Sequence, residues 1–319
     1  MLHVATTRPQ LSIVKGIVLA AFLTLFSGCA AIHQAHSDLD HSHSNSTAPS
    51  ADTEAQDWAK QRLEKSPRHR EWVKVKYKPA TSNTEREVNA FVVYPEVKTK
   101  ATAVLVIHEI FGMSSWVQSL TDELAEAGYI AIAPDLLSGM GPNKGGTSDV
   151  ATVDSNAIGK AIQTLPPDQI TADLNAVADY VAALPSANGK LTVTGFCWGG
   201  AQSFRFATNR PGVKATFVFY GATPMTGPQG NQVPDKAALA RLASPVYGFY
   251  AENDMRINAM LPATIEAMKQ LNKTYEPVTY AGAGHGFMRS GEDPNDKNSA
   301  NKKARDDAWK RWMDILAKI

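Results

Sequence analysis

Apolar runs of strand length alternate with segments of helical spacing along most of this chain, and this alternation narrows the folds open to it. Runs suited to buried strands cover residues 101–107, 129–133, 190–194, 214–220, 245–250 and 275–280. Helical spacing covers residues 116–127, 170–184, 198–208, 258–271 and 300–316. Two further segments alternate like half-buried strands and are expected to form an opening antiparallel pair, residues 72–77 and 87–94. The pattern predicts an α/β fold, with a mostly parallel sheet covered by helices on both faces.

The turn between the strand at 190–194 and the helix at 198–208 reads Gly195-Phe196-Cys197-Trp198-Gly199. This is the G-x-nucleophile-x-G pattern of a nucleophile elbow, with cysteine where serine usually stands. Glycines flank the nucleophile because a β-carbon there would collide with the neighbouring strand and helix. Since a strand precedes the pattern and a helix follows it, we interpret Cys197 as a nucleophile, with a packed structural thiol as the alternative.

A cysteine nucleophile needs a base, and the base needs an acid to orient it. His285 lies in a glycine-rich loop directly after the strand at 275–280 and is the candidate base. α/β-Hydrolases carry nucleophile, acid and histidine in that order along the chain, so the acid is expected between Cys197 and His285. Asp254 follows the strand at 245–250 and is the candidate acid, with Glu252 as the fallback. Capping of the next helix is the alternative role for Asp254.

The strand at 101–107 ends in the sequence His108-Glu109-Ile110-Phe111-Gly112. In α/β-hydrolases the backbone N–H groups after this strand and after the nucleophile form the oxyanion hole, so Ile110 and Trp198 are the expected donors. Glu109 is a carboxylate at the end of a buried apolar strand. We expect it either to tune the Cys197 thiol or to be solvated at the rim of the cleft. His69 precedes the first strand and is interpreted as a surface residue.

These motifs together resemble the dienelactone hydrolase family: the elbow cysteine, H-E-I-F-G at 108–112, A-P-D-L at 133–136, Asp254 and H-G-F at His285. The resemblance extends from about Trp72 to the C-terminus. It implies an α/β-hydrolase fold, a Cys197–Asp254–His285 triad, and neither metal nor organic cofactor.

The resemblance also implies roles for two charged side chains and marks one departure. It implies that Glu109 contacts the resting cysteine and that Arg289 grips a substrate carboxylate. A second carboxylate-binding arginine lies, in the family, between the second parallel strand and the helix before the elbow, but residues 133–184 contain no arginine. Acyl-bond hydrolysis is therefore predicted more firmly than dienelactone as the substrate.

We expect the protein to cleave a small-molecule ester or lactone through a thioester acyl-enzyme. Two alternatives remain: acyl transfer to another acceptor by the same triad, and a catalytically inactive, lipid-anchored binding module of the cell envelope. The 319 residues carry a formal net charge of only +1, which gives no reason to expect a nucleic-acid partner.

The N-terminus resembles a bacterial lipoprotein signal. Arg8 and Lys15 precede an apolar run at 17–26, which is too short to span a bilayer. The sequence F-S-G-C at 26–29 resembles a lipobox, so residues 1–28 are expected to be removed and Cys29 to be lipidated, which would anchor the protein to a membrane. Ala30 after the cysteine favours the outer membrane, with the protein facing the periplasm. Cleavage of a plain secretory signal nearby is the alternative.

Residues 29–67 are rich in His, Ser and Ala and are predicted to form a flexible tether, which leaves residues 68–319 for the hydrolase domain. The tether histidines could bind a metal loosely, but a solvated linker is our interpretation: His33, His36, His41 and His43. The chain has two cysteines. Lipid on Cys29 would leave Cys197 without an intramolecular disulfide partner.

Overall fold

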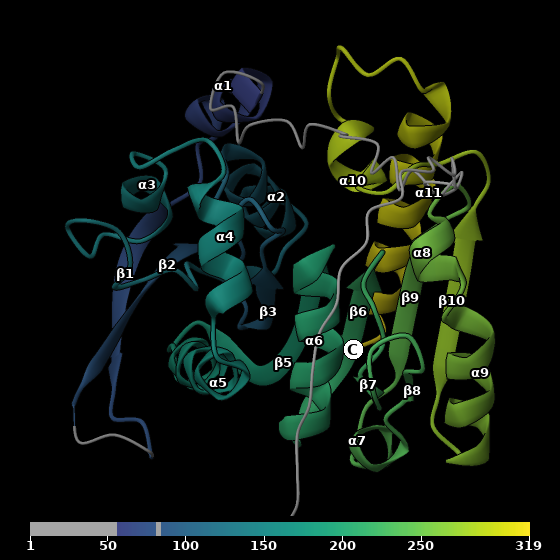
Figure 1. Ribbon diagram of the computed structural model, residues 1–319. Coiled ribbons are helices and arrows are strands. Elements are labelled where there is room, and N and C mark those ends of the chain that lie inside the picture. Colours follow the sequence, from purple (N-terminus) through teal and green to yellow (C-terminus); the bar gives the residue numbers. More distant parts are fainter. Residues whose placement is uncertain (1–55, 81–83) are drawn as a thin grey trace, which may run out of the picture. The chain divides into compact units, whose positions relative to one another are not determined.

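The structure is a computed structural model that describes residues 56–80 and 84–319 (Figure 1). Within these residues the main sheet has eight strands in the order β1–β2–β4–β3–β5–β6–β9–β10. Their bounds are β1 Arg70–Tyr77, β2 Arg86–Val93, β3 Ala101–Ile107, β4 Ile130–Pro134, β5 Ala187–Phe196, β6 Val213–Phe219, β9 Val246–Ala251 and β10 Tyr275–Tyr280. Strand β2 is antiparallel to both neighbours, and the pairs from β4 to β10 are parallel. The predicted α/β architecture and the opening antiparallel pair are confirmed.

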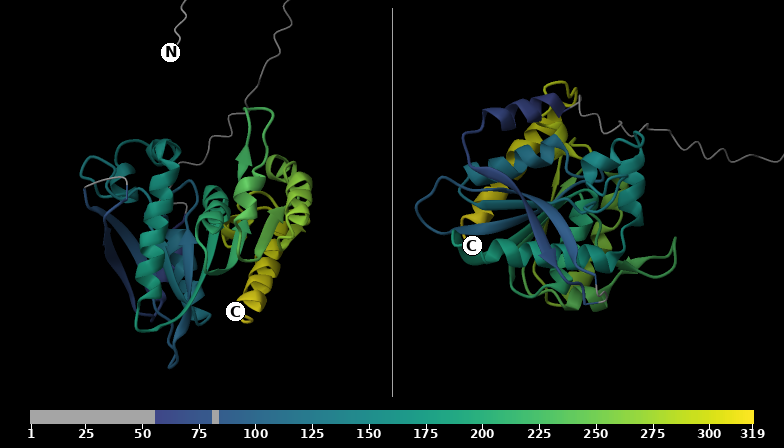
Figure 2. Two further views of the ribbon diagram at one scale, coloured as in Figure 1. Left: turned by 90° about the horizontal axis from the view of Figure 1, so that it is seen from below. Right: turned by 90° about the vertical axis from the view of Figure 1, so that its left-hand side faces the viewer.

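Helices cover both faces of this sheet (Figure 2). One face packs against α1 Asp57–Lys65, α2 Ser115–Glu126 and α11 Ser299–Leu316. The other packs against α4 Ala157–Thr164, α5 Pro167–Ala182, α6 Trp198–Asn209, α7 Lys236–Ala240 and α9 Leu261–Gln270. Short elements complete the described chain: α3 Thr147–Val150, β7 Met225–Thr226, β8 Val233–Pro234, α8 Met255–Asn258 and α10 Phe287–Ser290.

The period of two along each strand divides the core between the two faces. On β3, Val104 and Val106 face the α2 and α11 side, whereas Leu105 faces the α5 side. Aromatic rings fill the first side, where Trp312 of α11 lies 5.0 Å from Phe219, measured between ring centroids. Trp312 is completely buried. Replacing such a side chain by alanine typically costs about 3–5 kcal/mol.

Two sequence-based boundaries are wrong. The predicted tether at 29–67 contains helix α1, whose Ala59 is fully buried and whose Trp58 and Leu63 pack against the same core. The folded domain therefore begins before residue 68. The helix predicted at 258–271 is α9, which begins at Leu261 because Pro262 favours the first turn of a helix, and Asn258 instead ends the separate short helix α8. The predicted signal at 1–28, Cys29 and the tether histidines lie outside the described residues.

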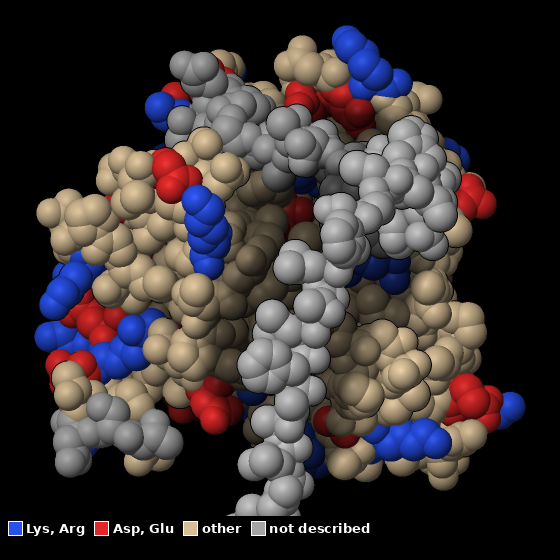
Figure 3. All heavy atoms as spheres, viewed as in Figure 1, with Lys and Arg blue, Asp and Glu red and all other residues tan. Residues whose placement is uncertain are grey.

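The surface of the described residues mixes both signs of charge. On the face shown in Figure 3, Lys and Arg lie among Asp and Glu. Between β1 and β2, Lys74 pairs with Glu87 at 2.8 Å. Across residues 56–80 and 84–319 no helix has the length and apolar character needed to cross a membrane.

Candidate active site

Cys197 lies on a strained turn between β5 and α6. Its backbone has φ +55° and ψ −117°, in the left-handed half of conformational space that residues other than glycine rarely occupy. A β-carbon on Gly195 would lie 2.0 Å from the carbonyl oxygen of Gly199, and one on Gly199 would lie 2.3 Å from that of His108. The glycines are therefore required by close backbone packing, as the elbow pattern predicts. The Cys197 thiol is free and partly exposed.

Asp254 and His285 meet at the carboxyl ends of the neighbouring strands β9 and β10. The imidazole Nδ1 of His285 is hydrogen-bonded to Oδ2 of Asp254. The other carboxylate oxygen, Oδ1, accepts a hydrogen bond from the N–H of Ile257 at 3.3 Å. Asp254 thus caps α8 and holds His285 at once, so the capping role is confirmed and leaves the same side chain available as the candidate acid. The fallback acid, Glu252, instead accepts a hydrogen bond from the N–H of Gly282 at 2.7 Å.

The surroundings of His285 favour its charged form. Burial lowers its pKa, but the hydrogen bond with Asp254 and the interaction with Cys197 outweigh burial and raise the pKa to about 9. Burial raises the pKa of Asp254, but the hydrogen bond with His285 outweighs burial and holds this pKa below its ordinary value. The imidazole remains accessible, because its side chain is 34% exposed. Since Nδ1 is engaged by Asp254, Nε2 is the nitrogen left for proton transfer.

Glu109 is buried and forms an ion pair with Arg289. Its side chain is only 2% exposed, and its Oε2 accepts a hydrogen bond from Nε of Arg289 at 2.9 Å. The expectation of a solvated glutamate at the cleft rim is therefore wrong. No hydrogen bond joins Glu109 to Cys197 within the described part of the chain. Arg289, expected to grip a substrate carboxylate, is held by Glu109, with its guanidinium 5.1 Å from the centre of the Phe111 ring.

Sequence reasoning missed Tyr220, which follows β6 and lies between these two pairs. Its ring is completely buried and meets the His285 ring edge-on at 5.0 Å between centroids. Its hydroxyl donates to Oε1 of Glu109 across 3.5 Å, which is a long and weak hydrogen bond. Tyr220 also has φ +39°. A tyrosine directly after the apolar run Phe217–Phe219 was the available signal, and parallel order places that end of the strand beside Cys197.

The two expected oxyanion donors lie on neighbouring segments. The start of α6 packs on the end of β3 through Gly199, and the Trp198 ring stacks on His108 at 5.6 Å. Trp198 opens α6, so its N–H lies in the first turn, where no intrahelical acceptor exists. The His108 ring is fixed in turn, because its Nε2 accepts from the N–H of Leu136 at 3.4 Å and its Nδ1 contacts the carbonyl oxygen of Glu109 at 2.8 Å.

The loop that carries Ile110 is supported by the A-P-D-L motif. Both oxygens of buried Asp135 bind Thr147, through its N–H at 2.7 Å and its hydroxyl at 2.8 Å. The hydroxyl of Thr147 accepts a hydrogen bond from the N–H of Met113 at 3.1 Å. A β-carbon on Gly112 would lie 2.4 Å from that hydroxyl, so glycine is needed at this point. Asp135 therefore supports the loop of Ile110 through Thr147.

Comparison with known proteins places the chain in a family. The sequence model of the dienelactone hydrolase family matches residues 88–319. The chain belongs to the dienelactone hydrolase family. This member is 29% identical to a Yersinia pestis protein named "Putative carboxymethylenebutenolidase", over 72% of this chain and 82% of the relative. It is 32% identical to an Escherichia coli K12 protein of the same name, over 66% of this chain and 74% of the relative.

Solved structures of the family share the fold. A crystal structure titled as a "Putative Dienelactone Hydrolase" from Klebsiella pneumoniae superposes with a TM-score of 0.64 at 26% identity, over 80% of this chain and all of that one. A dienelactone hydrolase from Anabaena variabilis has a TM-score of 0.52 at 19% identity, over 76% and 97% of the two chains, and this likeness concerns the fold alone. The family identifies this protein as an ester or lactone hydrolase with the α/β-hydrolase fold. Among the described residues no group of three or more His, Cys, Asp or Glu side chains could hold a metal ion.

Proposed function

We propose that this hydrolase cleaves its ester or lactone through a Cys197–His285–Asp254 triad and a thioester acyl-enzyme. The observation that carries the proposal is the convergence of three strand ends. Strained Cys197 follows β5, and the bonded pair Asp254 and His285 follows β9 and β10. In α/β-hydrolases this arrangement serves nucleophilic acyl transfer.

In the first half-reaction the Cys197 thiolate attacks the carbonyl carbon and forms a C–S bond. The negative charge that develops on the carbonyl oxygen is stabilised by the N–H groups of Ile110 and Trp198. Collapse of this intermediate breaks the C–O bond, and protonated His285 gives the leaving oxygen its proton from Nε2. Because the pKa of His285 is raised to about 9, its imidazole is protonated at neutral pH and can supply that proton. The helix α6 begins at the nucleophile, and its N-terminus favours a thiolate there.

In the second half-reaction neutral His285 takes a proton from water as the water attacks the thioester carbonyl. The C–S bond breaks, the carboxylic acid leaves, and Cys197 regains its thiolate beside the protonated imidazole. Asp254 stays ionised throughout, because its task is to hold Nδ1 and to stabilise the imidazolium.

Glu109 and Arg289 form an ion pair with no net charge, and we propose that this pair acts on the Cys197 thiol. Glu109 raises the pKa of Arg289, burial opposes this shift, and Cys197 acts in the same direction as Glu109. We assign Glu109 to the control of thiol ionisation through Arg289. Arg289 and the ring of Phe111 would then contact the acyl side of the substrate.

The decisive test compares the protein with its C197A variant on a panel of lactones, activated esters and thioesters. We expect kcat of C197A to be lower by at least about 10³-fold. In the unmodified protein, mass spectrometry should detect a trapped acyl adduct on Cys197. Full activity of C197A on any of these substrates would refute the triad. Adding an alcohol or amine acceptor separates hydrolysis from acyl transfer, and a thiol that is inert to iodoacetamide would favour the inactive binding module.

We also propose that the mature protein is held at the cell envelope by lipid on Cys29, on the strength of the lipobox-like sequence at 26–29. Replacement of Cys29 by alanine is expected to move the protein from the membrane fraction to the soluble fraction. The mass of the mature N-terminal peptide distinguishes lipidation from cleavage at another residue.

A further inference from the structure

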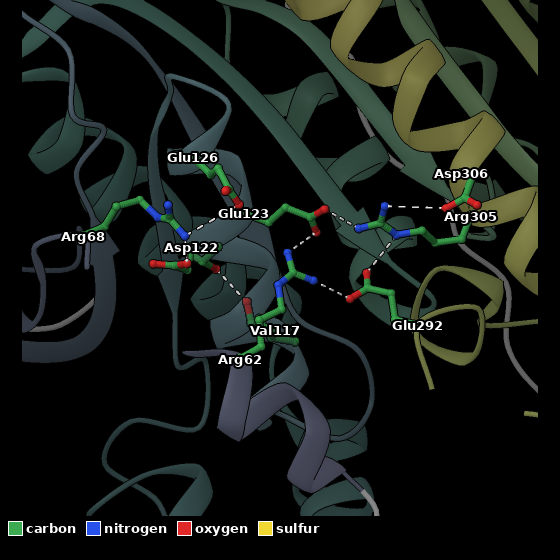
Figure 4. Close-up of polar contacts among 10 residues, drawn as sticks. Arg62, Arg68, Val117, Asp122, Glu123, Glu126, Glu292, Arg305 and Asp306 are labelled. Atoms are coloured by element: carbon green, nitrogen blue, oxygen red, sulfur yellow. Dashed lines mark hydrogen bonds and ion pairs between the residues drawn. The ribbon is translucent and has the colours of Figure 1, made fainter. Parts of the chain in front are cut away.

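A ring of four charged side chains lies outside the proposed triad and joins four segments of the chain (Figure 4). Arg62 of α1 contacts Glu123 of α2 and Glu292, which follows α10, at 2.9 Å each. Arg305 of α11 contacts the other oxygen of each glutamate, at 3.0 Å for Glu292. Each glutamate is thus held by both arginines, and the ring carries no net charge.

This ring is too buried to be an ordinary surface cluster. The side chains of Glu292, Arg305 and Glu123 are 8%, 11% and 12% exposed, and that of Arg62 is 34% exposed. Exposed ion pairs contribute little, whereas removal of one partner from a buried pair leaves an uncompensated charge that the protein interior cannot solvate. Burial and the charge of Glu123 raise the pKa of Glu292, and the two arginines oppose this shift. Loss of Arg62 would therefore weaken the ionised form of Glu292.

Glu292 belongs to the segment that carries the proposed catalytic histidine. It lies three residues after Arg289, and its N–H donates to the carbonyl oxygen of Arg289 at 3.2 Å. The other end of this segment is held by α11, because Asn301 Oδ1 accepts from the N–H of Gly284 at 2.8 Å. A β-carbon on Gly291 would lie 2.4 Å from the carbonyl oxygen of Asn301, so the segment is in close contact with α11.

Helix α1 reaches the other wall of the site as well. Oε1 of Gln56, just before α1, accepts a hydrogen bond from the N–H of Trp116 in the first turn of α2 at 2.9 Å. Helix α2 directly follows the loop of Glu109 and Ile110. The family match begins at residue 88, so α1 lies outside it. The region of α1, which lies outside the family match, therefore contacts α2, which follows the loop of Glu109, and Glu292, which follows Arg289.

We propose that α1 is a brace for the active site and that Arg62 is a positioning residue. It acts through Glu292 to hold the His285–Arg289 segment in register with the loop of Glu109 and Ile110. The inference rests on the proposed function for its kinetic consequence, but its structural consequence stands apart from activity.

The test uses four variants of the full chain. R62M removes the brace, and R62K keeps the charge but has one nitrogen in place of the two that contact Glu123 and Glu292. K60M is the matched control, because Lys60 is exposed on the same helix and makes no polar contact with another described residue. R62M/E292Q removes the excess negative charge that R62M would leave in the ring but does not restore the link to α1.

R62M is expected to lower kcat/KM about tenfold on the best substrate of the panel, mainly through kcat, while K60M leaves it unchanged. Hydrogen exchange at the amides of Gly284, Arg289 and Glu292 is expected to become about tenfold faster in R62M. R62K should recover part of both losses. R62M/E292Q should regain thermal stability but not kcat/KM. If the role of Arg62 were purely structural, the double variant would recover both.

Two results would overturn the brace. One is unchanged exchange and unchanged kcat/KM in R62M at a temperature well below its unfolding midpoint. The other is joint recovery of stability and activity in R62M/E292Q. If the unmodified protein hydrolyses nothing on the panel, the proposed function fails and the exchange rates alone decide on the brace.

Discussion

Two buried carboxylates at the same edge of the sheet each hold a basic side chain from one short segment, yet the two pairs behave differently. Asp254 is 7% exposed and binds His285. Glu109 is 2% exposed and binds Arg289, which lies four residues after His285. The first partner titrates in the working range of pH, and the second does not, because a guanidinium stays charged.

The difference separates two tasks that one carboxylate could not combine. In the proposed mechanism, Asp254 sets the tautomer and the proton affinity of His285, which gains and loses a proton in every turnover. Glu109 balances the permanent charge of the Arg289 guanidinium. We therefore expect Asp254 to control the rate and its pH dependence, and Glu109 to control which substrate charge the site accepts.

The largest expected effect is that of D254N. The amide cannot stabilise the imidazolium and favours the wrong tautomer of His285, so kcat is expected to fall about 10³-fold while KM changes little. Steady-state kinetics on a small activated ester measure this. D235N is the matched control, because Asp235 also caps a short helix but binds no histidine. Equal losses in both variants would reduce the role of Asp254 to helix capping.

The fold and the candidate triad residues could be read from the sequence because both depend on local patterns. Strand and helix periods gave the order of elements, and parallel order brings the ends of β5, β9 and β10 to one edge. The pairing of Glu109 with Arg289 could not be predicted, since these residues lie 180 positions apart and only packing brings them together. Helix α1 was placed in the predicted tether for the same reason. Its buried face is small, and its contact with the rest of the domain through Arg62 joins it to Glu292, which is distant in sequence.

E109Q is expected to change substrate preference rather than remove activity. It leaves the charge of Arg289 uncompensated, so the kcat/KM ratio of a carboxylate-bearing ester to its neutral analogue should rise about tenfold. Alkylation of Cys197 by iodoacetamide should also become faster, because the added positive charge favours the thiolate. R289M should shift both quantities in the opposite direction. Movement of both variants in the same direction would show that the pair is only structural.

The pH profile tests the other pair. The pKa of His285 is raised from 6.5 to about 9, so kcat/KM should fall about tenfold for each pH unit above 9, as the acid for the leaving group is lost. The stability linked to this proton is fully present below pH 6.5 and is lost as the pH rises through about 9. In D254N the alkaline limb should move to lower pH, whereas in E109Q it should stay near 9. A limb that moves in E109Q and not in D254N would reverse the assignment.

The smallest expected effect is that of Y220F, which touches both pairs at once. The variant keeps the ring that meets His285 edge-on and removes only the hydroxyl, whose bond to Glu109 spans 3.5 Å. A bond this long contributes little, so kcat/KM should change less than about fivefold and the alkaline limb should not move. Y250F is the control, because Tyr250 is also buried and its hydroxyl bonds to that of Tyr275 at 2.7 Å, away from Glu109. A loss in Y220F as large as that in D254N would mean that the Tyr220 hydroxyl couples the two pairs, and their separate roles would have to be abandoned.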